Sequence, residues 1–172
     1  MRTILTAAAI TLASALPLAA EPCQSILSDF SFCPSESWDR LDLELPKGIM
    51  VWQNGDVTAK VIVEAHASGT APDLDQIIAT IKRSVRASLP DPKAVSFGDY
   101  ETDDGAEADL GILAYDLDLR QGHLQVHHSV LVADQVTLQF LTSTGSDNDA
   151  ANLNAHREFI STFRLTEPSM SI

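Results

Sequence analysis

Residues 110–142 read LGILAYDLDLRQGHLQVHHSVLVADQVTLQFLT, and this stretch decides the fold. Apolar residues alternate with polar ones in three runs, which are residues 110–120, 123–132 and 136–142. A period of two is typical of β-strands that have one buried face. Only two short turns, at Gln121-Gly122 and Ala133-Asp134, separate the runs, so neighbouring strands must run antiparallel. The stretch therefore predicts an antiparallel meander.

The rest of the chain adds strands and two helices to this meander. Four upstream runs have strand character: residues 41–45, 49–53, 57–63 and 94–101. Asn54-Gly55 between two of these runs is a strong signal for a tight hairpin. Apolar residues recur at helical spacing in residues 74–89 and 153–163. The order β-β-β-α-β-β-β-β-α predicts an α+β fold, with a twisted antiparallel sheet of about six or seven strands and two amphipathic helices that cover one of its faces.

The N-terminus has the features of a secretory signal peptide. Met1-Arg2 precedes an uncharged run over residues 3–16, and small residues follow before Glu21. The run is shorter than the roughly 20 apolar residues of a membrane-spanning helix. We therefore expect cleavage near Ala20, a periplasmic or secreted mature chain, and no membrane span. Pro22 stands where a lipoprotein signal has a small residue, so we expect no lipid anchor.

The chain contains two cysteines, Cys23 and Cys33. In an exported protein an isolated pair is expected to form a disulfide. Their separation of ten residues is not the Cys-X-X-Cys spacing of an oxidoreductase, so we assign the bridge a structural role. The predicted organisation is a signal peptide (residues 1–20), a disulfide-closed segment (21–37) and a single α+β domain (38–168).

The charge of the chain excludes one class of partner. The sequence has 11 Lys and Arg residues against 24 Asp and Glu residues, a formal net charge of −13. Such a chain repels nucleic acid, and we exclude nucleic-acid binding. The acidic surface serves solubility, or alternatively it attracts a cationic partner or a divalent ion.

Three segments resemble PsbP-like and DcrB-like domains. They are residues 43–48 (LELPKG), the helix at residues 74–89 directly after the first hairpins, and the C-terminal residues 159–165 (FISTFRL). The resemblance covers residues 38–165 and implies a twisted antiparallel sheet flanked by helices. It also implies a non-enzymatic accessory or assembly role. The cysteine pair and the missing lipid anchor depart from the DcrB-like pattern, and no functional residue is carried over.

A polar strand face is the first candidate site. A two-residue turn at Gln121-Gly122 would place His127 opposite Asp116 and His123 opposite Arg120. Two uses of this face are open. A divalent metal would take Asp116, His127 and perhaps His123, whereas a protein partner would dock on the whole face: Asp116, Asp118, Arg120, His123, Gln125 and His127. An ordinary cross-strand Asp–His pair is the plainer interpretation.

An acidic run is the second candidate. It begins with Asp99, Glu101 and Asp103, whose spacing is similar to the start of a calcium loop. Asp104 and Leu110 stand where an EF-hand has its glycine and its bidentate glutamate, so the run is not an EF-hand. A weak surface calcium site and a solvated hairpin tip both remain open.

The sequence does not contain a nucleophile motif or a phosphate-binding glycine loop, and we expect no enzyme and no cofactor beyond a possible divalent metal. Trp52 is expected in the core, or alternatively as an exposed interface anchor beside the Asn54-Gly55 turn. We therefore expect an exported accessory or assembly protein that binds an envelope protein partner through its sheet face. The alternative is a divalent-metal-binding protein. A small hydrolase is the weakest alternative, because it needs His128 or His66 to meet a hydroxyl.

Overall fold

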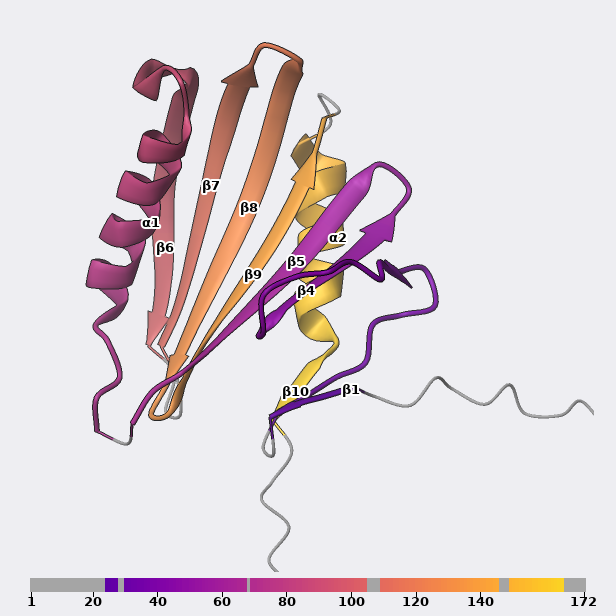
Figure 1. Ribbon diagram of the computed structural model, residues 1–172, viewed down its shortest axis with the longest axis vertical. Coiled ribbons are helices and arrows are strands. Elements are labelled where there is room, and N and C mark those ends of the chain that lie inside the picture. The colour runs from indigo at the N-terminus through magenta and orange to yellow at the C-terminus, as the bar shows by residue number, and fades with distance from the viewer. Residues whose placement is uncertain (1–23, 28–29, 68, 105–108, 146–148, 166–172) are drawn as a thin grey trace, which may run out of the picture.

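The computed structural model describes residues 24–27, 30–67, 69–104, 109–145 and 149–165. Its main feature is a seven-stranded antiparallel sheet in the order β3-β4-β5-β9-β8-β7-β6 (Figure 1). These strands are β3 (Asp39–Arg40), β4 (Ile49–Asn54), β5 (Val57–Ala65), β6 (Val95–Asp104), β7 (Asp109–Leu119), β8 (Gly122–Ala133) and β9 (Val136–Thr144). A small second sheet contains β1 (Gln24–Leu27), β2 (Phe30–Phe32) and β10 (Phe163–Leu165). The predicted α+β class and the antiparallel meander are confirmed.

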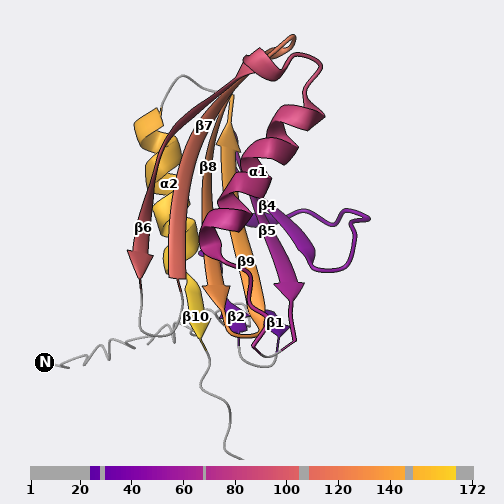
Figure 2. The ribbon, with the colours of Figure 1, turned by 90° about the vertical axis from the view of Figure 1, so that its left-hand side faces the viewer.

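Two helices cover the large sheet, one on each face (Figure 2). α1 (Leu74–Ser88) packs against β6, β7 and β8, whereas α2 (Asp149–Ser161) packs against β5, β8 and β9. The expectation that both helices lie on one face is therefore wrong. The central strands explain this, because β8 and β9 carry apolar residues on both faces. Val130 faces α1 while Phe140 faces α2, so each face needs its own cover.

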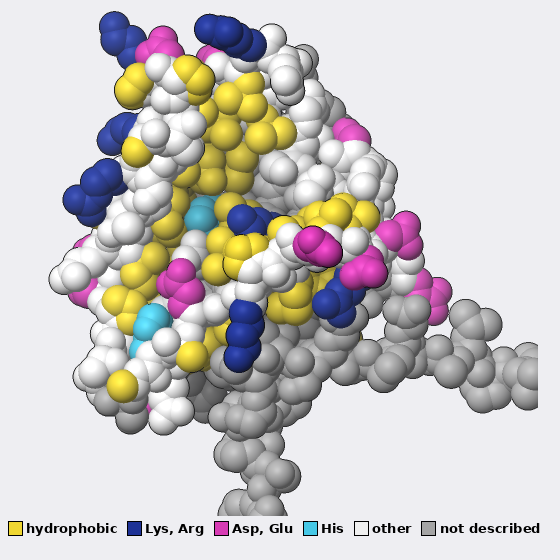
Figure 3. Space-filling model, in the orientation of Figure 1, with side chains coloured by type: hydrophobic (Ala, Val, Ile, Leu, Met, Phe, Trp, Pro, Cys, Tyr) yellow, Lys and Arg dark blue, Asp and Glu magenta, His cyan; other side chains and the backbone are white. Residues whose placement is uncertain are grey.

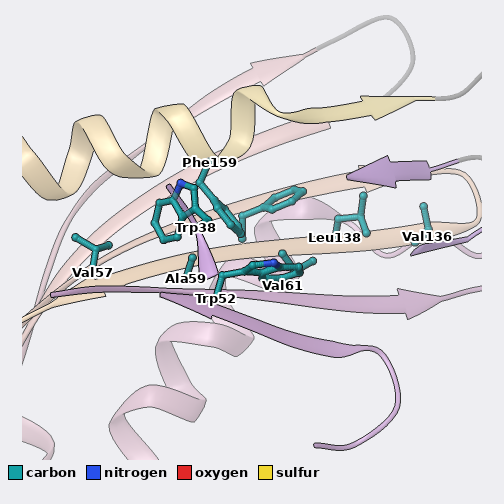
Figure 4. Close-up of a cluster of buried hydrophobic side chains, with 9 residues drawn as sticks. Trp38, Trp52, Val57, Ala59, Val61, Val136, Leu138 and Phe159 are labelled. Carbon is teal, nitrogen blue, oxygen red and sulfur yellow. The ribbon is translucent and has the colours of Figure 1, made fainter. Parts of the chain in front are cut away.

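An aromatic cluster forms the core beneath α2 (Figure 4). The ring of Phe159 lies 4.8 Å from Trp38 and 5.6 Å from Trp52, measured between centroids. Trp52 is only 1% exposed. The core interpretation of Trp52 is confirmed, and its use as an exposed interface anchor is wrong.

A second core lies beneath α1. The helix begins after Asp73, whose carboxylate accepts a hydrogen bond from the Gln76 backbone N–H at 3.1 Å, as expected of an N-cap. Leu74, Ile78 and Ile81 point into this core, which extends over β7 and β8. The burial of one stripe of the helix agrees with its predicted amphipathic pattern.

The first predicted strand, residues 41–45, does not form. Asp39 and Arg40 pair with β4, and the Leu41 backbone N–H still donates to the carbonyl of Val51, but Leu43 is 52% exposed instead of half-buried. The Leu43 backbone N–H donates to the carbonyl of Leu41 rather than to β4, which bends the chain away from the sheet. Alternation by itself did not reveal this local turn.

All three predicted tight hairpins form, but each turn lies one residue from its expected place. Gly55 and Asp56 connect β4 to β5, and only Gly55 has a positive φ, at 59°. Arg120 and Gln121 connect β7 to β8, because Gly122, at φ 139°, is already the first residue of β8. Asp134 and Gln135, instead of Ala133 and Asp134, connect β8 to β9. The displacement of the β7–β8 turn shifts its cross-strand register by two residues.

Several predictions concern the ends of the chain. The signal peptide and Cys23 lie outside the described residues. Cys33 follows β2, and no cysteine among the described residues is free. Its bridge to Cys23 stays a prediction, as do the domain boundaries. Within the described ranges, neither α1 nor α2 has the length and apolar character needed to cross a bilayer.

Candidate functional site: a groove between α1 and the sheet

Among the described residues, α1 is the helix on one side of the sheet, and it covers only half of that face. α1 lies over β6, β7 and β8, so β9, β5 and β4 are open on that side (Figures 1 and 2). A groove of about 630 Å³ runs between α1 and the open strands β9 and β5. Its wall is formed by residues of α1 that include Ile77, Thr80, Ile81, Ser84 and Val85. Figure 3 shows apolar side chains along this hollow, with a histidine and a basic side chain next to each other near its middle.

The floor of the groove contains a buried histidine. His128 is 3% exposed and its Nε2 lies 3.1 Å from Oε1 of Gln139. Burial lowers the pKa of His128 to about 4; the hydrogen bond to Gln139 opposes this shift, and the charge of Lys60 adds to it. The ring is therefore neutral at pH 7, with the proton on Nε2. Nδ1 has no hydrogen-bond partner among the described residues. The prediction that His128 is a core histidine bonded to a neighbour is confirmed.

The floor also presents three hydrogen-bond donors that no described residue uses. Lys60, on β5, is half-buried and forms no ion pair or hydrogen bond with any described residue. The Tyr115 hydroxyl likewise has no partner in the described part of the chain, and burial raises the pKa of Tyr115 to about 12, so it keeps its proton. Gln139 uses Oε1 for His128, which leaves its Nε2 hydrogens as donors.

The segment between β3 and β4 also exposes apolar side chains. This segment projects from the sheet on the same side as α1 (Figure 2). It exposes Leu43 and Leu45, at 52% and 38%, next to the exposed carboxylates of Asp42 and Glu44. Apolar side chains that stay exposed to water on the same side as an apolar groove are typical of an interaction surface.

A buried polar cluster lies on the opposite face, beneath α2. Nε2 of His156 lies 2.8 Å from the Ser129 hydroxyl, and its Nδ1 lies 2.9 Å from the Thr142 hydroxyl. The His127 ring packs 5.7 Å from the His156 ring. Burial, together with the two neighbouring histidines His127 and His128, lowers the pKa of His156 to about 3. This cluster was not predicted from the sequence, although His156 on the apolar stripe of a helix was a signal for it.

The Ser129–His156 pair does not reach a ligand. Ser129 is 0% and His156 1% exposed, so no substrate touches the hydroxyl. Another histidine, His66, meets a hydroxyl at 2.7 Å, that of Thr137, which is also 0% exposed. Both pairs therefore hold the fold together as hydrogen-bonded side chains.

The polar strand face is divided by the shifted register. His127 lies opposite Ala114, not Asp116, and it is buried under α2, so the predicted His127–Asp116 pair is wrong. His123 lies opposite Asp118 instead of Arg120. Both ring nitrogens of His123 face carboxylates, with Nδ1 2.9 Å from Asp118 and Nε2 3.4 Å from Asp116.

The other members of this face are scattered. Arg120 is exposed in the β7–β8 turn, and Gln125 is half-buried, with its Oε1 unpaired among the described residues. The exposed remnant suitable for a partner is thus Asp116, Asp118 and His123.

The acidic run lies along an edge strand. Asp99 and Glu101 are exposed on β6, and the side chain of Asp103 lies outside the described part. In the described ranges, no three His, Cys, Asp or Glu side chains gather closely enough to hold a metal ion. Metal binding at His123 or at the acidic run stays a prediction, which calorimetric titration with zinc and calcium tests.

Comparisons with known proteins match the fold. Cyanobacterial PsbP (CyanoP) from Synechocystis is 15% identical with a TM-score of 0.62, over 90% of this chain and 98% of that one. LpqN of Mycobacterium tuberculosis, involved in cell envelope biogenesis, is 15% identical with a TM-score of 0.57, over 80% and 83% of the two chains. No family model matches, and no curated protein matches. The chain therefore has a PsbP-like fold, as the resemblance of its sequence segments implied.

Proposed function

We propose that this protein is an exported, non-enzymatic accessory protein that binds a protein partner in the groove beside α1. The observation that carries the proposal is the groove itself, a mostly apolar hollow beside a sheet face that no described helix covers, with donors on its floor that no described residue uses. A packed sheet normally buries such a face, so an uncovered one is a place for another chain to dock. LpqN, which shares the fold, is described as acting in cell envelope biogenesis, and this supports an envelope role here.

The hydroxyl–histidine pairs support a non-enzymatic role. A nucleophile has to touch its substrate, and Ser129 and Thr137 are both fully buried. The low pKa of His156, about 3, leaves its ring a weak base in the described geometry. Neither of these two hydroxyls lines the α1 groove.

Export is tested by the mature N-terminus. When the full chain is expressed with a C-terminal tag in a Gram-negative host, we expect osmotic shock to release a product that begins at or within two residues of Glu21. The physical reason is that residues 1–20 carry the charged start, the apolar run and the small residues of a cleavable signal. N-terminal sequencing and the intact mass report the cleavage. A product that keeps Met1 and stays in the cytosol contradicts export.

Partner binding is tested by filling the groove. In Ser84→Trp an indole projects from α1 into the groove, and we expect at least a tenfold loss of the crosslinked partner from the native envelope fraction. Ala79→Trp is the matched control, because Ala79 is exposed on α1 but does not line the groove. Quantitative mass spectrometry of the captured proteins measures both variants against the parent chain.

Two outcomes count against the proposed function. One is that no protein is enriched over the tag control. The other is that the same partner is captured equally by the Ser84→Trp and Ala79→Trp variants. In the second case the exposed remnant at Asp116, Asp118 and His123 becomes the surface to change, by Asp116→Lys.

A further inference from the structure

We infer that the groove beside α1 accepts an amphipathic helix of the partner, whose carboxylate pairs with Lys60 on the groove floor. The inference rests on the proposed function and specifies the chemistry of the docking segment. It is carried by the charge of Lys60, which no described residue pairs with, by the dimensions of the open sheet face, and by Glu64 in the lining of the same groove.

The open face has the size of one helix. α1 has 15 residues, so the groove beside it is about 22 Å long at about 1.5 Å per residue. The open strands β9, β5 and β4 span about 14 Å, at about 4.8 Å per strand, which accommodates a helix about 10 Å wide. Ile62 and Leu141 on the floor and Ile77 and Val85 on α1 supply the apolar contacts.

The positive charge of Lys60 restricts which partner segment can cover the groove floor. Cross-strand pairing sets Lys60, Leu141 and His128 in one row across β5, β9 and β8. His128 is neutral, and the nearby Gln139 amide and Tyr115 hydroxyl are donors, so nothing described on the floor neutralises the ammonium. Covering a half-buried ammonium with an apolar segment is unfavourable unless an acceptor arrives with it. An Asp or Glu of the partner supplies this acceptor.

The acidic residues near the groove indicate which charge the partner helix carries away from its central acid. Glu64 lines the same groove, four residues from Lys60 on the same face of β5, a Cα separation of about 13 Å. Asp42 and Glu44 are exposed on the segment that projects on the same side of the sheet as α1. A partner helix lying along β5 would thus carry its acid over Lys60 and a Lys or Arg about nine residues away, over Glu64. Complementarity of this kind sets the orientation of a docked helix.

The test is a selection from a defined library. Displayed 20-residue helical peptides, with apolar residues at i, i+3, i+4 and i+7 and random residues elsewhere, are panned against the mature domain. We expect enriched peptides to carry one Asp or Glu at the centre of the apolar stripe and a base about nine residues away. Panning against Lys60→Glu should enrich Lys or Arg at that central position. Lys93→Glu, the same charge change on an exposed residue outside the groove, should leave the preference unchanged.

The affinity of one selected peptide gives the second readout. By fluorescence anisotropy we expect Lys60→Glu to weaken binding at least thirtyfold and Lys60→Met, which keeps the aliphatic stem and avoids a buried negative charge, about tenfold. The Met variant keeps the test valid if the Glu variant does not fold.

Three outcomes would overturn the inference. Enriched peptides could show no acidic preference, they could bind Ser84→Trp as well as the parent, or the groove could select no peptide while binding dansyl-undecanoate, which would make it an acyl-chain site. If the envelope partner still depends on Ser84 in crosslinking while the charge preference is absent, the proposed function stands and only the chemistry of the docking segment is wrong.

Discussion

Phe159→Ala is expected to lower the free energy of unfolding by about 3–5 kcal/mol, a cost typical of deleting a buried aromatic ring. Phe159 is 0% exposed and is the only described residue that α2 contributes to the aromatic cluster with Trp38 and Trp52 (Figure 4). Its ring contacts both indoles, so its loss removes two aromatic contacts and leaves a cavity under the helix. Urea unfolding of the mature domain, followed by tryptophan fluorescence, measures the change.

The control for this substitution is Leu43→Ala. Leu43 is 52% exposed, so its truncation should change the free energy of unfolding by less than about 0.5 kcal/mol. If Phe159→Ala unfolds at the same urea concentration as Leu43→Ala, then α2 does not close the core as described.

Acidification from pH 6.5 to 4.5 is expected to destabilise the fold by about 2–3 kcal/mol for each of two buried histidines. Burial lowers the pKa of His128 to about 4 and that of His156 to about 3. In the unfolded chain both groups titrate near 6.5, so below this pH the unfolded state binds more protons than the folded state. These two histidines therefore do not lower the free energy of unfolding above about pH 6.5. The free energy of unfolding falls as the pH decreases toward their pKa values in the folded state.

The urea midpoint measured at several pH values tests this linkage. The double variant His128→Gln with His156→Gln should start from a lower midpoint but lose much less of it between pH 6.5 and 4.5. His123→Gln, which removes a part-exposed histidine between two carboxylates, is the matched control and should not flatten the slope in this way. A parent chain whose midpoint is constant over this range would show that the buried rings do not titrate as described.

Much of the fold could be predicted because its signals are local. The alternation in β7, β8 and β9 identifies these strands without reference to distant residues, and short turns impose antiparallel pairing. The apolar stripe and Asp73 cap identify α1 in the same way. Leu41, Leu43 and Leu45 show the limit of such signals, since alternation was present but the chain turned away from the sheet.

The candidate site was much harder to predict, because small displacements decide it. The β7–β8 turn lies one residue earlier than predicted, so His127 pairs with Ala114 instead of Asp116. His127 is also buried beneath α2. His128 was recognised as a buried, bonded histidine, but its partner Gln139 lies on the next strand. The sequence did not indicate a role for Lys60, because the position of one lysine in a strand has no meaning until its neighbours in the fold are known.

By itself the sequence determined the α+β class, the antiparallel meander and the two amphipathic helices, because each depends on residues close together in the chain. Tertiary structure alone decided that the helices take opposite faces and that β5 pairs with β9, which brings Lys60 into one row with Leu141 and His128. The groove arises from that long-range arrangement. No local pattern encodes it, because its floor and wall come from strands and a helix whose mutual positions are set by the burial of both faces of one sheet.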